Sequence, residues 1–147
     1  MSKSDIFWPM GALALLTFLV LGLIPIRRIG AALRKEVKPD DFRYGESAQV
    51  SGYISLPNRS MMNLLELPLL FYVICIMCYI SDNVGNAMLY LAWIYVCLRF
   101  VHTVIHLSYN NVLHRLIAFA ASNVALMAMW VIFFVGLGTD ASLQIPK

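Results

Sequence analysis

Four long apolar segments, separated by polar turns, dominate the pattern of the chain. They span about residues 6–34, 58–81, 86–109 and 112–138. Each segment approaches or exceeds the about 20 residues that a helix needs to cross the hydrocarbon core of a bilayer. Because lipid offers no hydrogen-bond partner to an open backbone, we expect all four to be helices. The pattern predicts an all-α, integral membrane four-helix bundle that forms a single domain over residues 1–147.

Composition supports a membrane protein. The chain is 61% hydrophobic and 13% charged, and a soluble domain of this length has too little interior to bury so much apolar surface. The net charge of +3 is too small to indicate a nucleic-acid partner. The three cysteines lie inside apolar segments, where packing is favoured over a redox or zinc role for the Cys75-x-x-Cys78 pair.

Basic residues predict how the bundle is oriented. The connection between the first two segments, with their flanks, carries seven of them: Arg27, Arg28, Arg34, Lys35, Lys38, Arg43 and Arg59. The opposite side has only Lys3 and Lys147, at the termini. The positive-inside rule therefore predicts that this connection is cytoplasmic and that both termini lie outside the cytoplasm. We expect the first segment to be a span rather than a signal peptide, because no small-residue cleavage site follows it.

Polar residues recur on one face of the second segment. Arg59, Asn63 and Glu66 are spaced i, i+4 and i+7, which places them on the same side of a helix. Pro68 follows directly, where a kink is expected. Glu66 should then lie below the headgroups, a depth at which a carboxylate is usually paired or functional.

The third and fourth segments add polar groups at a similar depth. Arg99, His102 and His106 are spaced i, i+3 and i+7, again on one face. In antiparallel spans Arg99 should lie level with Glu66, and we expect an ion pair between them. Arg115 opens the fourth segment. Together these residues predict a polar cavity near the cytoplasmic face.

Several interpretations of this cluster stay open. His102, His106 and Glu66 have the spacing of metal ligands, but the neighbouring arginines repel a cation, so no metal site is predicted. A proton relay is disfavoured because the cluster lies on one side only. The charged groups could also serve helix packing alone. The excess of arginine favours a small ligand with carboxylates, which arginine binds bidentately.

The pattern resembles the MAPEG family, membrane-associated proteins in eicosanoid and glutathione metabolism. The resemblance covers nearly the whole chain. It is carried by Arg59-x-x-x-Asn63-x-x-Glu66 with Pro68, by Arg99-x-x-His102, and by Arg115. Within the family the motifs are similar to those of the microsomal prostaglandin E synthases, in a version typical of a bacterial branch and thus of the bacterial inner membrane.

The resemblance implies a homotrimer that binds glutathione between subunits near the cytoplasmic face. It implies that Arg115 is the catalytic residue, stabilising the glutathione thiolate, and that a hydrophobic co-substrate arrives from the lipid. It assigns glutathione contacts to seven residues: Arg34, Arg59, Asn63, Glu66, Arg99, His102 and His106. His106 departs from the tyrosine that enzymes of the family often have there, and the alignment at Arg34 is poor.

Three functions follow as hypotheses. The first is a glutathione-dependent transferase or peroxidase that acts on a lipophilic electrophile. The second is a non-catalytic lipid-binding protein with the same fold. The third is a structural subunit of a larger membrane complex.

Overall fold

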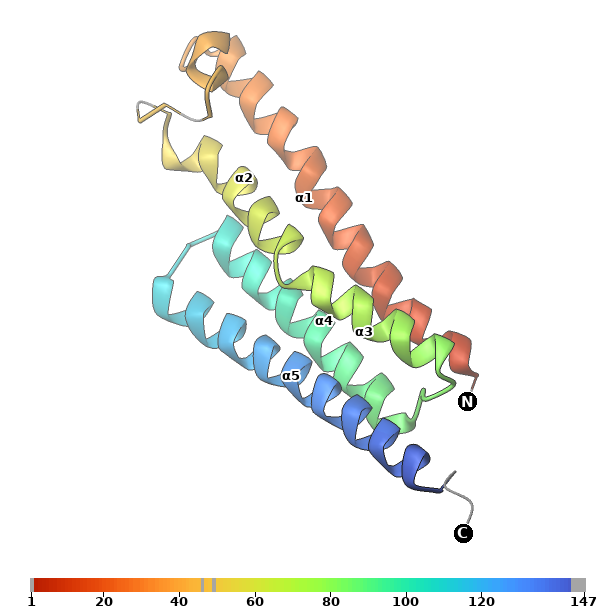
Figure 1. Ribbon diagram of the computed structural model, residues 1–147. Helices are drawn as coiled ribbons and strands as arrows, with labels where there is room; N and C mark the ends of the chain where they lie inside the picture. Colours follow the sequence, from red (N-terminus) through yellow and green to blue (C-terminus); the bar gives the residue numbers. More distant parts are fainter. Residues whose placement is uncertain (1, 46, 49, 144–147) are drawn as a thin grey trace.

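The chain forms an elongated bundle of helices in the computed structural model, which describes residues 2–45, 47–48 and 50–143 (Figure 1). Its elements are η1 (Lys3–Ile6), α1 (Phe7–Leu33), η2 (Pro39–Phe42), α2 (Gly52–Leu65), α3 (Pro68–Ile80), α4 (Asn86–Leu107) and α5 (Val112–Leu143). No β-strand forms within these described ranges. The predicted all-α class is confirmed.

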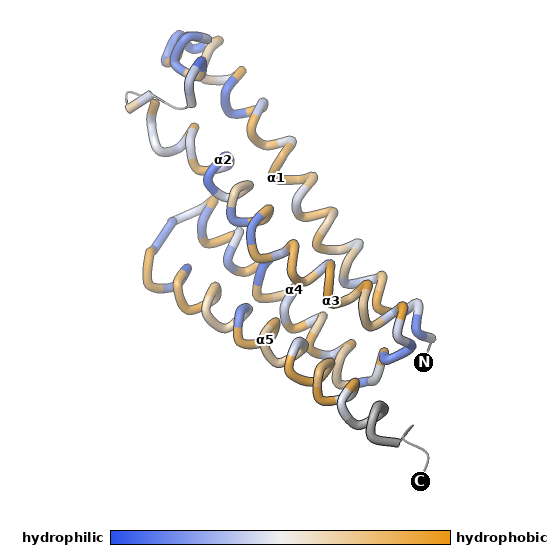
Figure 2. Tube along the Cα trace, in the orientation of Figure 1, coloured by the Kyte–Doolittle hydropathy of each residue, from blue (hydrophilic) through white to orange (hydrophobic). Residues whose placement is uncertain are grey.

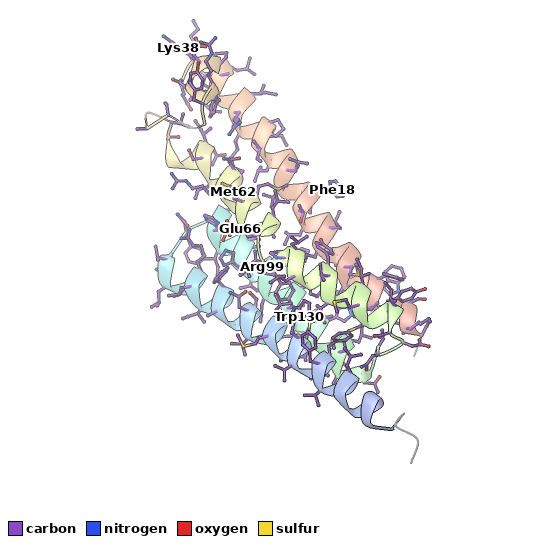
Figure 3. The ribbon with its side chains drawn as sticks, in the orientation of Figure 1. Phe18, Lys38, Met62, Glu66, Arg99 and Trp130 are labelled. Carbon is purple, nitrogen blue, oxygen red and sulfur yellow. The ribbon has the colours of Figure 1, made fainter. Side chains whose placement is uncertain are left out.

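Four stretches are long and apolar enough to cross a membrane. They are Lys3–Leu33, Gly52–Ile80, Asn86–Leu107 and Val112–Gly138. Large apolar side chains on their outer faces are strongly exposed, for example Trp8 at 73% and Phe18 at 68%; Figure 3 shows Phe18 on the outer side of α1. Such surfaces are untenable in water but suit a hydrocarbon environment. The protein is therefore a multi-pass membrane protein surrounded by lipid.

The second span is broken in two, which is more than the kink expected at Pro68. The helix α2 ends at Leu65, and Glu66 has a non-helical ψ of −98°. The helix α3 restarts at Pro68, which occupies the first turn. Proline fits there because its missing N–H would have no partner in a first turn anyway. The span also begins at Gly52, earlier than the predicted start near residue 58.

Tight pairing of α4 with α5 builds the part of the bundle that holds the polar residues. These two helices make the most extensive contact in the fold. Asn110 adopts a positive φ of 48° in the turn between them, a conformation that asparagine tolerates. Asn111 then caps α5, because its Oδ1 accepts from the amides of Leu113 and His114 at 3.0 and 3.1 Å.

The two ends of the bundle differ in polarity. The N-terminus and the α3–α4 turn lie at one end, and Lys3 pairs there with Asp82 at 3.1 Å. The α1–α2 connection and the α4–α5 turn lie at the other, which we name the connection end (Figure 1). Figure 2 shows polar positions of α2 and α4 gathered toward the connection end. Lys147, one of the two basic residues predicted to lie outside the cytoplasm, lies outside the described residues.

Candidate functional site

A stripe of buried polar side chains runs along α4 toward the connection end. It consists of Tyr95, Arg99, His102, Thr103 and His106, each at most 3% exposed. Each of them has at least one buried polar atom without a hydrogen-bond partner among the described residues. Buried polar groups are normally paired. Thr103 lines a separate groove beside α1, and the unused atoms of the other four residues indicate a place for a polar ligand or for water.

Arg99 is the most deeply buried charge of the stripe. It is fully buried, and its Nη2 donates to the backbone carbonyl of Asn63 at 2.5 Å. That carbonyl lies in the last turn of α2, where helix carbonyls lack amide partners and carry the negative end of the helix dipole. Nε and Nη1 of Arg99 have no partner in the described part of the chain. The site thus holds a cation with two unused donors.

His102 connects α4 to the start of α5. Its Nδ1 lies 3.0 Å from the carbonyl oxygen of Arg115. Since a carbonyl can only accept, Nδ1 carries the proton, and Nε2 of the neutral ring remains as a buried acceptor. The side chain of Arg115 is held by the α4–α5 turn, because its Nη1 donates to Oδ1 of Asn110 at 2.8 Å.

A cavity of about 210 Å³ opens beside these groups. It is lined by Asn63, His102, Val112, Arg115, Leu116 and Phe119. Three spans therefore contribute to one hollow, with Asn63 from α2, His102 from α4 and Arg115 from α5. Phe119 also lies near the buried cation, with its ring centroid 5.7 Å from Cζ of Arg99.

Two predicted members of the cluster lie at its outer edge, close enough for Glu66 to interact electrostatically with Arg99 and Arg59 with His106, but without direct contact. Arg59 and Glu66 are exposed on the outside of the chain. The expected ion pair between Glu66 and Arg99 is wrong, because no such pair forms among the described residues. The break after Leu65 carries Glu66 out of the helical register that placed it level with Arg99. Figure 3 shows Glu66 at the junction of α2 and α3 and Arg99 inside the bundle.

Arg34 lies in the α1–α2 connection rather than at the cavity. It is the C-cap residue of α1 and pairs with Glu36 through Nε and Nη2, at 2.7 and 3.2 Å. The hydrogen bond from Arg34 lowers the pKa of the exposed Glu36 carboxyl below its ordinary value. In a single chain, Arg34 contributes to the connection and not to the buried stripe.

His106 lies at the shallow end of the stripe, next to His102. Their ring centroids are 5.9 Å apart in an edge-to-face arrangement. His106 is 2% exposed, and its Nδ1 has no partner in the described ranges. The two rings therefore extend the polar surface of α4 from the cavity toward the connection end.

Sequence reasoning missed three residues of this region. Phe119 and Asn110 shape the cavity and hold Arg115, but an apolar wall and a turn residue carry no signal of their own. The sequence identifies Arg27 only as an orientation charge, yet its Nη1 donates to the carbonyl of Tyr53 at 2.8 Å. Pro57 stands four residues after Tyr53 and has no N–H to bond that carbonyl, a spacing that could have revealed the need for a donor.

A second cavity, of about 330 Å³, lies between α3 and α5, farther from the connection end. Its walls are mostly apolar, formed by Leu67, Leu70, Asn123, Leu126, Met127 and Trp130. Asn123 is one turn beyond Phe119 along α5, so the two cavities follow each other along the same helix. The apolar cavity thus begins about one turn of α5 beyond the polar one.

The fold and site together define a class: a four-span helical membrane protein with a buried cationic site at one end. The MAPEG family model matches residues 6–135, and the chain belongs to the MAPEG family. Comparison with curated proteins and with solved structures gives no match.

Proposed function

We propose that the protein is a glutathione-dependent membrane transferase or peroxidase that acts on a lipophilic electrophile. Family membership supports a glutathione-related membrane function. The observation that carries the proposal is Arg99, a fully buried cation with two unused donors beside a cavity lined by His102 and Arg115. A buried charge is costly unless it is paired, and an anionic ligand removes that cost.

The unused atoms fit a ligand that has both acceptors and donors. Arg99 offers two N–H groups, which suit a carboxylate. His102 offers a bare Nε2 as an acceptor, which suits an amide or ammonium group. Glutathione has carboxylates, amides and an ammonium group in one small molecule. In this proposal Arg99, His102 and Asn63 hold the peptide, with His106 farther along the stripe.

Arg115 is the proposed catalytic residue. It lines the cavity, and Asn110 fixes its guanidinium. A cation close to a thiol favours the thiolate, which is the nucleophile. In a transferase reaction the thiolate sulfur forms a bond to the electrophilic carbon of the co-substrate, the bond from that carbon to the leaving atom breaks, and its electron pair stays on the leaving atom. In a peroxidase reaction the sulfur attacks a peroxide oxygen, the O–O bond breaks with its electron pair on the departing oxygen, and a second glutathione converts the oxidised sulfur to the disulfide.

The apolar cavity between α3 and α5 is the proposed site of the lipophilic co-substrate. Its lining includes Leu70, Leu126 and Met127, and it lies within two candidate membrane spans. A hydrophobic molecule dissolved in the bilayer could enter it sideways, without passing through water. On the shared helix α5 this cavity begins one turn beyond Phe119, so a long co-substrate that extends past Phe119 could bring its reactive group toward Arg115.

We also propose that the working unit is a homotrimer. The polar cavity of about 210 Å³ is smaller than the about 300–1,000 Å³ typical of ligand sites. A neighbouring copy could supply the missing wall and bring the ligand against the exposed Arg59 and Glu66, and against Arg34. Native mass spectrometry tests this assembly, since a purely monomeric protein that still binds glutathione would contradict it.

The proposed orientation places the connection end in the cytoplasm, as in a bacterial inner membrane. Arg34, Lys35 and Lys38 lie in or beside the connection at this end. Positively charged connections favour the cytoplasmic side. Labelling of a cysteine introduced at Lys38 in sealed, right-side-out vesicles should fail, and ready labelling would reverse the assignment.

Calorimetric titration with glutathione and thiolate absorbance in the near ultraviolet test the proposed enzyme together. The wild type should bind glutathione and show the thiolate band at neutral pH. Arg115→Gln should keep binding and lose the band, whereas Arg99→Gln should lose binding. Lys38→Gln removes one positive charge far from the cavity and serves as the control. No binding to the wild type would refute the proposal.

A second candidate is favoured by the apolar cavity, which is larger than the polar one. In that case the protein binds a lipid without thiol chemistry, and the buried arginine serves assembly. Retention of a fluorescent fatty acid by wild type, with no glutathione binding and no thiolate band, would select this function.

A further inference from the structure

A third hollow lies between α1 and α4, apart from the two cavities that α5 lines. This α1–α4 groove has a volume of about 350 Å³. It is lined by Leu16, Leu19, Val20, Leu23, Thr103, Val104, Leu107 and Ser108. None of these residues lines the two cavities used above, and both helices are candidate membrane spans.

One residue that lines the groove has an unused hydroxyl. Thr103 is 2% exposed, and its hydroxyl has no hydrogen-bond partner among the described residues. Two other hydroxyls bond back to the carbonyl four residues earlier: Thr17 does so at 3.0 Å and Ser81 at 2.8 Å. The Thr103 hydroxyl does not, and it therefore remains free to bond an occupant of the groove.

A cation stands at the connection end of the same groove. Arg27 is one turn beyond Leu23 on α1, and its Nη2 donates to the carbonyl of Leu107 at 3.4 Å. Arg27 has no carboxylate partner in the part of the chain that the structure describes. Arg27 stacks on the ring of Tyr53 and donates to two backbone carbonyls. The groove therefore ends at a positive charge that no carboxylate among the described residues neutralises, and basic pockets between spans favour anionic lipid headgroups.

We propose that the α1–α4 groove binds one acyl chain of an anionic phospholipid. The chain lies against Leu16, Leu19 and Val20, the ester carbonyl accepts from the Thr103 hydroxyl, and the phosphate faces Arg27. Thr103 and Leu107 are four residues apart, about 6 Å along the helix axis. An ester group and its phosphate follow one another in the same order along a phospholipid.

Native mass spectrometry of the delipidated full chain, titrated in detergent with phosphatidylglycerol or phosphatidylcholine, tests the site. The wild type should bind one phosphatidylglycerol per chain more tightly than phosphatidylcholine. Thr103→Ser keeps the hydroxyl and should bind equally well. Thr103→Val removes it with little change in shape and should bind about two- to tenfold more weakly, the value of one hydrogen bond.

A pair of larger side chains provides the structural control. Val104 lines the groove and is 61% exposed, so Val104→Phe fills the groove without entering the core and should abolish selective binding. Val101 is 49% exposed on the same helix and does not line the groove, so Val101→Phe should have no effect. Helix content from circular dichroism verifies that each variant folds.

Three results would overturn the proposal. Equal affinity for the two phospholipids would refute headgroup recognition by Arg27. Unchanged binding by Thr103→Val would refute the hydrogen bond from the hydroxyl. Disulfide cross-linking between copies through Val104→Cys would mean that a second copy of the chain covers the groove. Glutathione binding is measured in the same samples and stays intact if only the lipid site fails.

Discussion

The guanidinium of Arg99 donates to the backbone carbonyl of Asn63 and so joins α4 to the last turn of α2. The contact forms because the second span is interrupted. In a continuous helix, an amide of the next turn would donate to that carbonyl. A cation at a helix C-terminus also interacts favourably with the helix dipole. The break near Pro68 therefore leaves free the carbonyl that the buried arginine uses as its hydrogen-bond acceptor.

Replacing Arg99 by methionine should raise the stability of the ligand-free protein. The substitution loses a hydrogen bond of a charged group, about 1.5–3 kcal/mol. It also removes a buried, unpaired charge, whose penalty is several kcal/mol. Because the second effect is larger, we expect a net gain of about 1–3 kcal/mol in the free energy of unfolding, measured by denaturant titration in detergent.

The same variant should lose any stabilisation by glutathione. The wild type should gain about 2.7 kcal/mol at a glutathione concentration of 100 times Kd, and Arg99→Met should gain nothing. Arg59→Met, which changes an exposed arginine, should leave the ligand-free stability within about 0.5 kcal/mol. A clear loss of ligand-free stability in Arg99→Met would mean that capping α2 outweighs the cost of the buried charge.

The sequence predicts the spans well because each depends on local hydrophobic length, and Asn110–Asn111 predicts the turn into α5. The sequence predicts the partners of Arg99 poorly. Helical spacing places Glu66 on the face of Asn63 only if the helix is continuous. The conformation of a single residue, Glu66, decides which groups Arg99 meets, and no periodic pattern contains that information.

Arg27 should contribute to the stability of the fold, because Pro57 leaves the carbonyl of Tyr53 without an amide donor. Arg27→Met removes the donors to the carbonyls of Tyr53 and Leu107 and should cost about 1–3 kcal/mol of unfolding free energy. Pro57→Ala restores an N–H at the position that normally bonds Tyr53. In that background Arg27→Met should cost less by about 0.5–1.5 kcal/mol, measured as the coupling in a double-mutant cycle. Strict additivity would show that Arg27 does not substitute for the missing amide.

The Arg34–Glu36 pair should give Glu36 a low titration midpoint. The hydrogen bond from Arg34 lowers the pKa of Glu36 below its ordinary value of 4.5. A lowered folded-state pKa stabilises the protein at pH values above 4.5, and that contribution is lost as the pH falls through the lowered value. Carboxyl titration by nuclear magnetic resonance should show the low midpoint, which should return toward 4.5 in Arg34→Gln. An unchanged midpoint in that variant would assign the shift to another cause.

The hydrogen bond from Arg115 to Asn110 predicts how one added charge would change the pKa of the bound thiol. In Asn110→Asp the residue keeps its positive φ, which aspartate also tolerates, and the neutral acceptor 2.8 Å from Nη1 of Arg115 becomes a carboxylate. The arginine charge is then largely compensated. The thiol of bound glutathione should show a pKa about one unit higher, a loss of about 1.4 kcal/mol of thiolate stabilisation.

The neighbouring Asn111 provides the matched control for that change. Asn111→Asp adds the same charge one residue away, but its side chain caps α5 and has no contact with Arg115 among the described residues. An aspartate caps a helix N-terminus as well as asparagine does, so stability should be preserved. The pH titration of thiolate absorbance should shift in Asn110→Asp and much less in Asn111→Asp. Equal shifts in the two variants would mean that the general field at the connection end, and not contact with Arg115, sets the thiol pKa.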